Sequence, residues 1–323
     1  MSQDDRINQG LALLLAGRID EGLACYSETV RNDRLSDAPF GVHLRLLESA
    51  GQNSAARQLR SMALTMGADI SPKPAGSGAP DREVIRHYEQ LFAAGLANSR
   101  MVFEYLRVLA SAQETGCMRD MLRPDLLLRV EQTDPVLAAA VGETLEELDH
   151  AFEYRQADQS VRQMRRLKHI LAVQHPVIAE LSDLLRWQTE QYLRDWSRMD
   201  HPLAHLVPSD FRIDGWALIS TGDGHNVQHI HQKGWATGIY YPSAVEGAGG
   251  DLVIGRPESA AGSDQDWAQR KLSPEVGTLI LMPSFYTHWT QPLQGAGKRT
   301  AIAFDVLPNE AALEGGGRTR ART

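Results

Sequence analysis

Three histidines and one arginine are the residues whose types and spacing best suit chemistry. His229 and His231 stand two positions apart, His288 follows 57 residues after His231, and Arg299 follows 11 residues later. Side chains alternate between the faces of an extended strand, so His229 and His231 would point the same way, about 6 to 7 Å apart. The pair predicts two ligands of one metal ion. His288, just after the strand-like run 277–282, is the predicted third ligand.

The kind of metal follows from the ligand type. Imidazoles suit iron, copper, nickel or zinc, and open positions beside such ligands are typical of oxygen-activating non-haem iron. Each histidine alone is read more simply as a solvated strand or loop residue, and it is the joint pattern with Arg299 that favours a metal site. In a strand Lys298 and Arg299 would face opposite ways, so only one of them can reach that site.

Composition limits the remaining possibilities. With 323 residues the chain is long enough for two domains with separate cores. A formal net charge of -8 argues against a nucleic-acid-binding protein, which normally carries a basic surface. No stretch has the roughly 18 consecutive apolar residues of a membrane span, and the N-terminus does not resemble a signal peptide. We therefore expect a cytoplasmic protein with no membrane or nucleic-acid partner, in which Cys25 and Cys117 are reduced.

The N-terminal part carries an internal repeat. Gly17, Gly22 and Thr29 recur as Gly51, Ala56 and Ala63, each displaced by 34 residues, which is the period of the tetratricopeptide repeat (TPR). The sequence predicts TPR-like helical repeats over residues 1–70, with a generic pair of helical hairpins as the alternative. Two repeats are fewer than a stable stack usually needs, so further helices should cover the open end.

The middle of the chain reads as a linker followed by helices. The Pro- and Gly-rich stretch 71–81 cannot hold a helix and is the predicted linker. Residues 82–164 are predicted to form a helical capping and connecting region, with Val84, Tyr88, Leu91, Phe92 and Leu96 on one helix face. His175 and Pro176 mark the start of a long amphipathic helix that could continue to Trp196.

The C-terminal part changes to short strands. Runs rich in β-formers occupy 216–219, 237–241, 251–254, 278–281 and 300–306, separated by Gly and Pro, which suggests a sandwich or jelly roll. Residues 309–323 read as a flexible tail. The predicted fold class is therefore α+β in two parts, with helical repeats followed by a β domain. The bounds of this domain, residues 165–308, come from the resemblance of its residues to a known family.

The residues of this β domain resemble a known family. The runs 225–235, 238–242, 249–252, 277–284, His288 and 298–305 are similar to 2-oxoglutarate/Fe(II)-dependent oxygenases, including ones fused to TPR repeats, and more distantly to prolyl hydroxylases. The resemblance implies a double-stranded β-helix (jelly roll), Fe(II) as the metal and 2-oxoglutarate as the cosubstrate. It further implies hydroxylation of a C–H bond, with a peptide or protein side chain as a possible substrate recruited by the TPR-like region.

The same resemblance assigns roles to individual residues. His229 matches the family's first ligand and His288 its distal histidine, whereas His231 stands where a carboxylate is usual. Arg299 matches the cation that binds the distal carboxylate of 2-oxoglutarate through two hydrogen bonds, and Tyr241 matches a tyrosine that bonds the same carboxylate. His225 and Asp251 remain alternative third ligands. Packing is the alternative role for Tyr241.

Two other functions compete with a 2-oxoglutarate/Fe(II) dioxygenase. A cupin-type dioxygenase or isomerase also uses a His-x-His pair in a jelly roll, but it would have a glutamate about four residues later, where this chain has 235–237, Trp-Ala-Thr. A non-catalytic TPR scaffold with a degenerate oxygenase domain is the other, and His231 in the carboxylate position favours it. Trp235, Tyr286 and Trp289 could line a substrate pocket or serve in packing.

Overall fold

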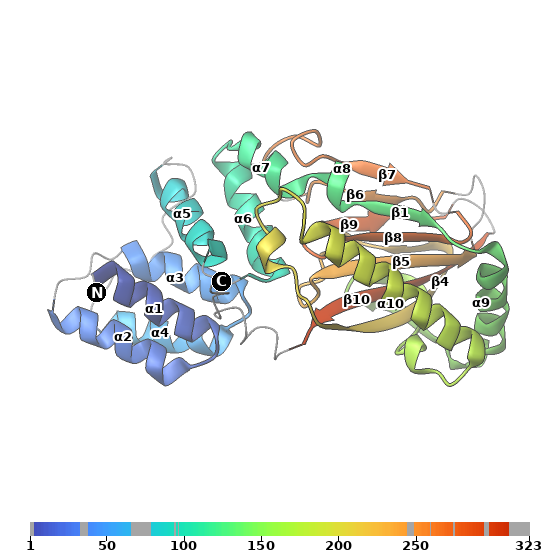
Figure 1. The fold of residues 1–323 in the computed structure, drawn as a ribbon, viewed down its shortest axis with the longest axis horizontal. Helices are drawn as coiled ribbons and strands as arrows, with labels where there is room; N and C mark the ends of the chain where they lie inside the picture. The colour runs from blue at the N-terminus through green and yellow to red at the C-terminus, as the bar shows by residue number, and fades with distance from the viewer. Residues whose placement is uncertain are drawn as a thin grey trace, which may run out of the picture. The chain divides into compact units, whose positions relative to one another are not determined.

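The chain forms two compact units, Met1–Ala112 and Gln113–Thr323. The computed structural model describes residues 3–32, 38–65, 79–93, 95, 97–243, 249–258, 260–273, 275–293 and 297–309. Its first unit is helical, and its second combines helices with sheets (Figure 1). The α+β organisation predicted from the sequence, helical first and β-rich second, is confirmed.

The described residues of unit 1 form two successive helical hairpins and two more helices. Its helices are α1 (Gln3–Leu15), α2 (Ile19–Asn32), α3 (Ala38–Ser49), α4 (Asn53–Thr65), α5 (Ala79–Ala93) and α6 (Ser99–Ser111). Gly17 and Gly51 form the hairpin turns with φ of 78° and 76°, values that favour glycine. Gly22 lets α1 and α2 approach closely, because a Cβ there would lie 2.7 Å from the Leu14 side chain.

The structure describes only part of what the sequence predicts for the helix faces, the linker and the tail. Val84, Tyr88, Leu91 and Phe92 are buried, as their spacing predicts. The predicted linker 71–81 lies outside the described residues except for its last three positions, which begin α5. The predicted tail lies outside them beyond Asn309. Among the described helices, none combines the length and apolarity that crossing a membrane requires.

Unit 2 has helices on the outside of two antiparallel sheets. The helices are α7 (Thr115–Leu122), α8 (Pro124–Leu127), α9 (Pro135–Glu147) and α10 (Pro176–Trp196), with short 3-10 turns η1 (Asp149–Ala151), η2 (Ile170–Ala172) and η3 (Ala204–Leu206). α10 starts at Pro176, as the sequence predicts. It buries Ile178, Leu181, Leu185, Tyr192 and Trp196 along one face.

The larger sheet has the strand order β1-β8-β5-β10-β4-β3-β2 and the smaller one β7-β6-β9. The bounds are β1 (Arg129–Gln132), β2 (Glu153–Asp158), β3 (Val161–Leu167), β4 (Phe211–Asn226), β5 (Ala236–Ser243), β6 (Leu252–Ile254), β7 (Arg270–Leu272), β8 (Thr278–Pro283), β9 (His288–Thr290) and β10 (Lys298–Pro308). All five predicted strands are present. Two antiparallel sheets of this kind have a jelly-roll-like layout.

The region 82–164, predicted to be a helical capping and connecting region, contains strands as well as helices. β1, β2 and the start of β3 come from this region and join the larger sheet, and the predicted domain start at 165 falls inside β3. These strands are polar or exposed along much of their length, and no residue of β2 is fully buried. These strands form because they pair with neighbouring strands, and they contain no long apolar run. Their sequences therefore carry only a weak signal for a strand.

One face of the larger sheet positions the functional residues. On β10, Arg299, Ala301, Ala303 and Asp305 alternate onto this face, and the cross-strand partners of the last two on β4 are Trp216 and Asp214. Thr237, Ile239 and Tyr241 of β5 and Met164 and Arg166 of β3 continue the face on either side. Four adjacent strands, in the order β5-β10-β4-β3, thus form the floor of a cavity.

Candidate metal centre

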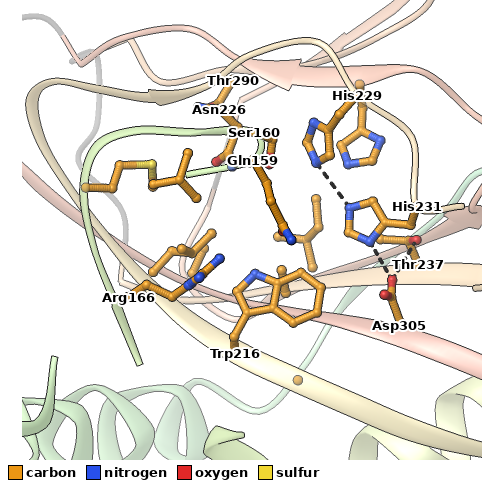
Figure 2. A pocket seen from close by; sticks show the side chains of 18 of the residues that line it. Gln159, Ser160, Arg166, Trp216, Asn226, His229, His231, Thr237, Thr290 and Asp305 are labelled. Carbon is orange, nitrogen blue, oxygen red and sulfur yellow. Dashed lines mark hydrogen bonds and ion pairs between the residues drawn. The ribbon is translucent and has the colours of Figure 1, made fainter. Parts of the chain in front are cut away.

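The three predicted histidine ligands lie together at this cavity. One ring nitrogen of each of His229, His231 and His288 falls within 4.8 Å of the others. The Nε2 atoms of His229 and His231 are 3.1 Å apart, and the ring centroids of His229 and His288 are 4.3 Å apart. Figure 2 shows the imidazoles of His229 and His231 turned toward one another over the cavity.

Backbone pairing of two distant segments brings the histidines together. His229 and His288 form an isolated antiparallel bridge, with hydrogen bonds of 3.1 and 3.0 Å in both directions, and His231 N donates to Ser284 O at 3.0 Å. The expectation of a regular strand through His229 and His231 is wrong, because β4 ends at Asn226. The two residues still pair with the same 284–288 segment, so their side chains share one side.

Each imidazole is oriented by an acceptor at its Nδ1 atom. His229 Nδ1 lies 2.8 Å from Val227 O, His288 Nδ1 lies 3.0 Å from Tyr286 O, and His231 Nδ1 contacts the Asp305 carboxylate closely. An acceptor at Nδ1 favours the tautomer that carries its proton there. The Nε2 lone pairs are then available for a metal, which is the usual arrangement around ligating histidines.

The surroundings keep the rings of His229 and His288 neutral. Burial, together with the neighbouring His231, lowers the pKa of His229 to about 3. Burial, together with the two other rings, lowers the pKa of His288 well below its ordinary value. At neutral pH His229 and His288 therefore present lone pairs rather than protons, and a bound cation would remove the repulsion between the facing Nε2 atoms. The donor set fits a divalent transition metal.

Asp305 and Trp216 belong to the site although the sequence reasoning gave neither a role. The carboxylate of Asp305 also lies 3.5 Å from Thr237 Oγ1, which in turn is 2.7 Å from Ser284 Oγ. The side chains of His231 and Asp305 are only 7% and 19% exposed, so the contact is shielded from solvent. Trp216 stacks on the His231 ring, with centroids 5.6 Å apart and planes at 18° (Figure 2).

The predicted cosubstrate residues lie at the other end of the same face. Arg299 is 2% exposed, and its guanidinium bonds Gly250 O and, at 3.2 Å, Ser220 Oγ. Within the described part of the chain, Arg299 Nε and Tyr241 Oη are buried and have no hydrogen-bond partner. Burial lowers the pKa of Arg299 and raises that of Tyr241. Lys298 points elsewhere, 3.5 Å from Glu146, as strand alternation predicts.

The histidines, Arg299 and Tyr241 line one cavity of about 710 Å³. The alternative ligands lie elsewhere. His225 Nδ1 is 2.7 Å from Asp223 O, and the carboxylate of Asp251 bonds Ser273 and Lys271 at 2.8 and 2.7 Å. The described lining of this cavity does not include the three aromatic residues suggested by the sequence, Trp235, Tyr286 and Trp289. Trp235 packs against Trp196 instead, with centroids 5.6 Å apart.

Comparison with known proteins identifies the β-rich segment. A family model described as "Putative 2OG-Fe(II) oxygenase" matches residues 214–305, a segment that contains the three histidines, Tyr241, Arg299 and Asp305. This segment is therefore a 2-oxoglutarate/Fe(II) oxygenase domain, and the predicted enzyme class with its cofactors, Fe(II) and 2-oxoglutarate, is confirmed at that level. A search of curated proteins gave no match.

Several solved structures are similar to this chain. A Pseudomonas putida prolyl-4-hydroxylase has 12% sequence identity and a TM-score of 0.43, with 60% of this chain and 98% of that chain covered. A prolyl hydroxylase from Trichoplax adhaerens, in complex with a hypoxia inducible factor peptide fragment, has 13% identity, coverage of 63% and 94%, and a TM-score of 0.42. HygX from Streptomyces hygroscopicus, with nickel, 2-oxoglutarate and hygromycin B bound, has 14% identity, coverage of 58% and 85%, and a TM-score of 0.40.

Proposed function

We propose that this chain is a dioxygenase that hydroxylates a C–H bond, with His229, His231 and His288 as the Fe(II) ligands. In this proposal Arg299 and Tyr241 hold the distal carboxylate of 2-oxoglutarate. One observation carries the assignment: a buried guanidinium nitrogen and a buried phenol, both without a partner, line the same cavity as three converging imidazoles. A carboxylate would accept hydrogen bonds from both groups and place the rest of the cosubstrate beside the metal.

The chain's own residues divide the remaining work. Bound Fe(II), with 2-oxoglutarate and dioxygen, supplies the oxidising power for the hydroxylation. Arg299 orients the cosubstrate, and the small side chains of Ala301 and Ala303 leave room over the floor between Arg299 and Asp305. Trp216 covers one face of the His231 ring, which fixes the orientation of that imidazole and limits water at the ligand.

Asp305 supplies the negative charge that the ligand set itself lacks. Iron sites of this type usually combine two histidines with one carboxylate, whereas a set of three imidazole ligands contributes no negative charge. Here the carboxylate of Asp305 lies on the opposite side of the His231 imidazole and accepts a hydrogen bond from its Nδ1–H group. Such a contact raises the basicity of the ligand nitrogen and fixes its direction.

Cosubstrate binding tests the proposal. We expect one Fe(II) and one 2-oxoglutarate per chain, and succinate formation that needs both. Arg299→Ala should weaken 2-oxoglutarate binding and leave Fe(II) affinity unchanged, with Arg212→Ala, an exposed arginine on β4, as the matched control. Unchanged 2-oxoglutarate affinity in Arg299→Ala would favour the cupin-type reading. Absence of metal binding would favour a non-catalytic scaffold.

We further propose that the two helical hairpins of unit 1 are TPR-like repeats that recruit a peptide or protein substrate. The 34-residue repeat, the glycine turns and the close approach at Gly22 support this assignment. A peptide substrate, once identified, should lose kcat/KM when exposed polar residues of α2 and α4 are replaced. Turnover of 2-oxoglutarate without that peptide should not change.

A further inference from the structure

We propose that the substrate carries an anionic group, a carboxylate or a phosphate, that binds at Arg166 on the β3 side of the cavity. The proposal rests on the proposed function for the position of the reaction centre. It concerns the part of the cavity across Trp216 from His231 (Figure 2). Its residues are Arg166 on β3, Lys168 just after β3 and Gln159 at the β2–β3 turn, with Trp216 of β4 at its border, and Lys233 lines the same cavity.

Strand order separates this region from the cosubstrate residues. Arg166 is the cross-strand partner of Leu218, and Leu218 is in turn the partner of Ala301 on β10. β4 therefore lies between Arg166 and the strand that carries Arg299 and Asp305. Two interstrand spacings amount to roughly 10 Å, and the two guanidinium groups are held by different partners, Arg166 by Asp158 and Arg299 by Gly250.

Arg166 is held in place and still has donors to offer. Its side chain is 10% exposed, and one guanidinium nitrogen contacts the Asp158 carboxylate closely. The Nε atom is buried and has no hydrogen-bond partner among the described residues. An anchored guanidinium with unused N–H groups is a recognised arrangement for binding carboxylate or phosphate, because little side-chain freedom remains to be lost.

The charge of the surrounding cavity supports an anionic ligand. Its lining contains four cationic side chains, Arg166, Lys168, Lys233 and Arg299, and two carboxylates, Asp214 and Asp305. Both carboxylates contact histidines, whereas the lysine ion pairs in the described residues involve Lys271 and Lys298 only. Lys168 and Lys233 thus contribute unpaired positive charge in a chain whose formal net charge is -8.

The neighbouring side chains define the rest of the substrate. Figure 2 shows Gln159 and Arg166 across the cavity from His231, with Trp216 between them at the floor. Trp216 offers an apolar surface beside the metal ligands, and the Gln159 amide offers both a donor and an acceptor. A substrate that suits this arrangement places an apolar C–H segment over Trp216 and its acidic group at Arg166. A cavity of about 710 Å³ can hold such a molecule together with 2-oxoglutarate.

Matched pairs of ligands test the proposal. The full-length protein, loaded with redox-inert Zn²⁺ and saturating 2-oxoglutarate, is titrated by saturation-transfer NMR with N-acetylglutamate and N-acetylglutamine. A second pair consists of short capped peptides with a central Glu or Gln, and a third of phosphoserine and serine. Saturating 2-oxoglutarate keeps Arg299 occupied. The three pairs distinguish a free carboxylic acid, a peptide carboxylate and a phosphate as the source of the anion.

The expected result is binding of the acidic member of at least one pair, with the neutral member weaker by about tenfold or more. Arg166→Gln should remove that preference, and Arg166→Lys should restore part of it. The control is Arg165→Gln, which removes one positive charge from the same strand. Arg165 bonds Asp149 and is not among the residues that line the cavity. Circular dichroism and the melting temperature check that each variant is folded.

Three outcomes would overturn the proposal: no binding by any acidic member, equal binding of neutral members, or an equal loss in Arg165→Gln and Arg166→Gln. Failure of the proposed function is a separate result. It would appear as absent metal or 2-oxoglutarate binding, and the anion preference of the metal-free protein is then assigned to Arg166 by its loss in Arg166→Gln and its retention in Arg165→Gln.

Discussion

Asp305 should set how tightly the histidine cluster holds Fe(II). Asp305→Asn keeps an oxygen that can accept from His231 Nδ1 but removes the negative charge, and Asp305→Ala removes both. The contact is shielded, since the two side chains are 7% and 19% exposed. Loss of such a partner typically lowers metal affinity by about 10- to 100-fold. We therefore expect about 1.4 kcal/mol of lost binding free energy in Asp305→Asn and about 2.8 kcal/mol in Asp305→Ala.

The assay is anaerobic competition for Fe(II) between the protein and a chromophoric chelator, repeated with Co(II) so that its visible spectrum reports on coordination. Asp214→Asn is the matched control. Asp214 is the cross-strand partner of Asp305 and lines the same cavity, but its carboxylate lies 3.2 Å from His169 Nδ1 rather than against a predicted ligand. Its Fe(II) affinity should equal that of the wild type.

Equal Fe(II) affinity in the wild type and Asp305→Ala would refute the reasoning, as would an equal loss in Asp214→Asn. If only Asp305→Ala loses affinity, the hydrogen bond matters and the charge does not. Co(II) spectra that change in Asp305→Ala but not in Asp214→Asn would show that the effect acts on coordination rather than on folding.

Four further results are expected. His288→Ala should abolish Fe(II) binding, and full stoichiometry in that variant would contradict the ligand assignment. Arg299→Ala should cost about 2 to 5 kcal/mol in 2-oxoglutarate binding, with partial recovery in Arg299→Lys, measured by calorimetry. The double variant His231→Asp with Asp305→Asn should retain Fe(II), because the second change avoids two adjacent carboxylates. His231→Ala should bind Fe(II) weakly. Identical Fe(II) affinities in the wild type and both variants would exclude His231 as a ligand. His43 is buried with its pKa lowered to about 3, so below its unfolded pKa near 6.5 the unfolded chain gains a proton that the folded chain excludes. The fall in the free energy of unfolding from pH 7.5 to 5.5, measured by urea titration, should therefore be smaller in His43→Gln than in the wild type by about 1.4 kcal/mol.

Much of the β domain could be predicted because its central strands are apolar. β5 and β8 are buried along nearly their whole length, so their sequences read as continuous β-rich runs. The opposite directions of Lys298 and Arg299 followed from strand alternation alone. The proximity of His229 and His231 likewise followed from their spacing, since alternate residues of a paired segment share one side even where no regular strand forms.

The residues that complete the site could not be predicted, because they depend on register between distant segments. Asp305 meets His231 across 74 positions of sequence, and nothing in either local run indicates the contact. Trp216 reads simply as part of a strand until β4 is placed beside β10. Arg166 lies on a polar strand near the edge of the sheet, where the sequence signal for a strand is weak.

The substitution of His231 for a carboxylate raises the question of whether the pocket is degenerate. A pocket without a ligand gains nothing from a buried Arg299 with an unbonded Nε next to an unbonded Tyr241 hydroxyl. Leaving a buried polar group unsatisfied costs about 1 to 3 kcal/mol, and apolar side chains of similar size would avoid that cost. Both groups line the same cavity as three imidazoles whose Nδ1 atoms each have an acceptor. A bound carboxylate would satisfy Arg299 and Tyr241, and a bound metal would use the three imidazoles. The free-energy cost of these buried polar groups therefore favours a working oxygenase over a degenerate one.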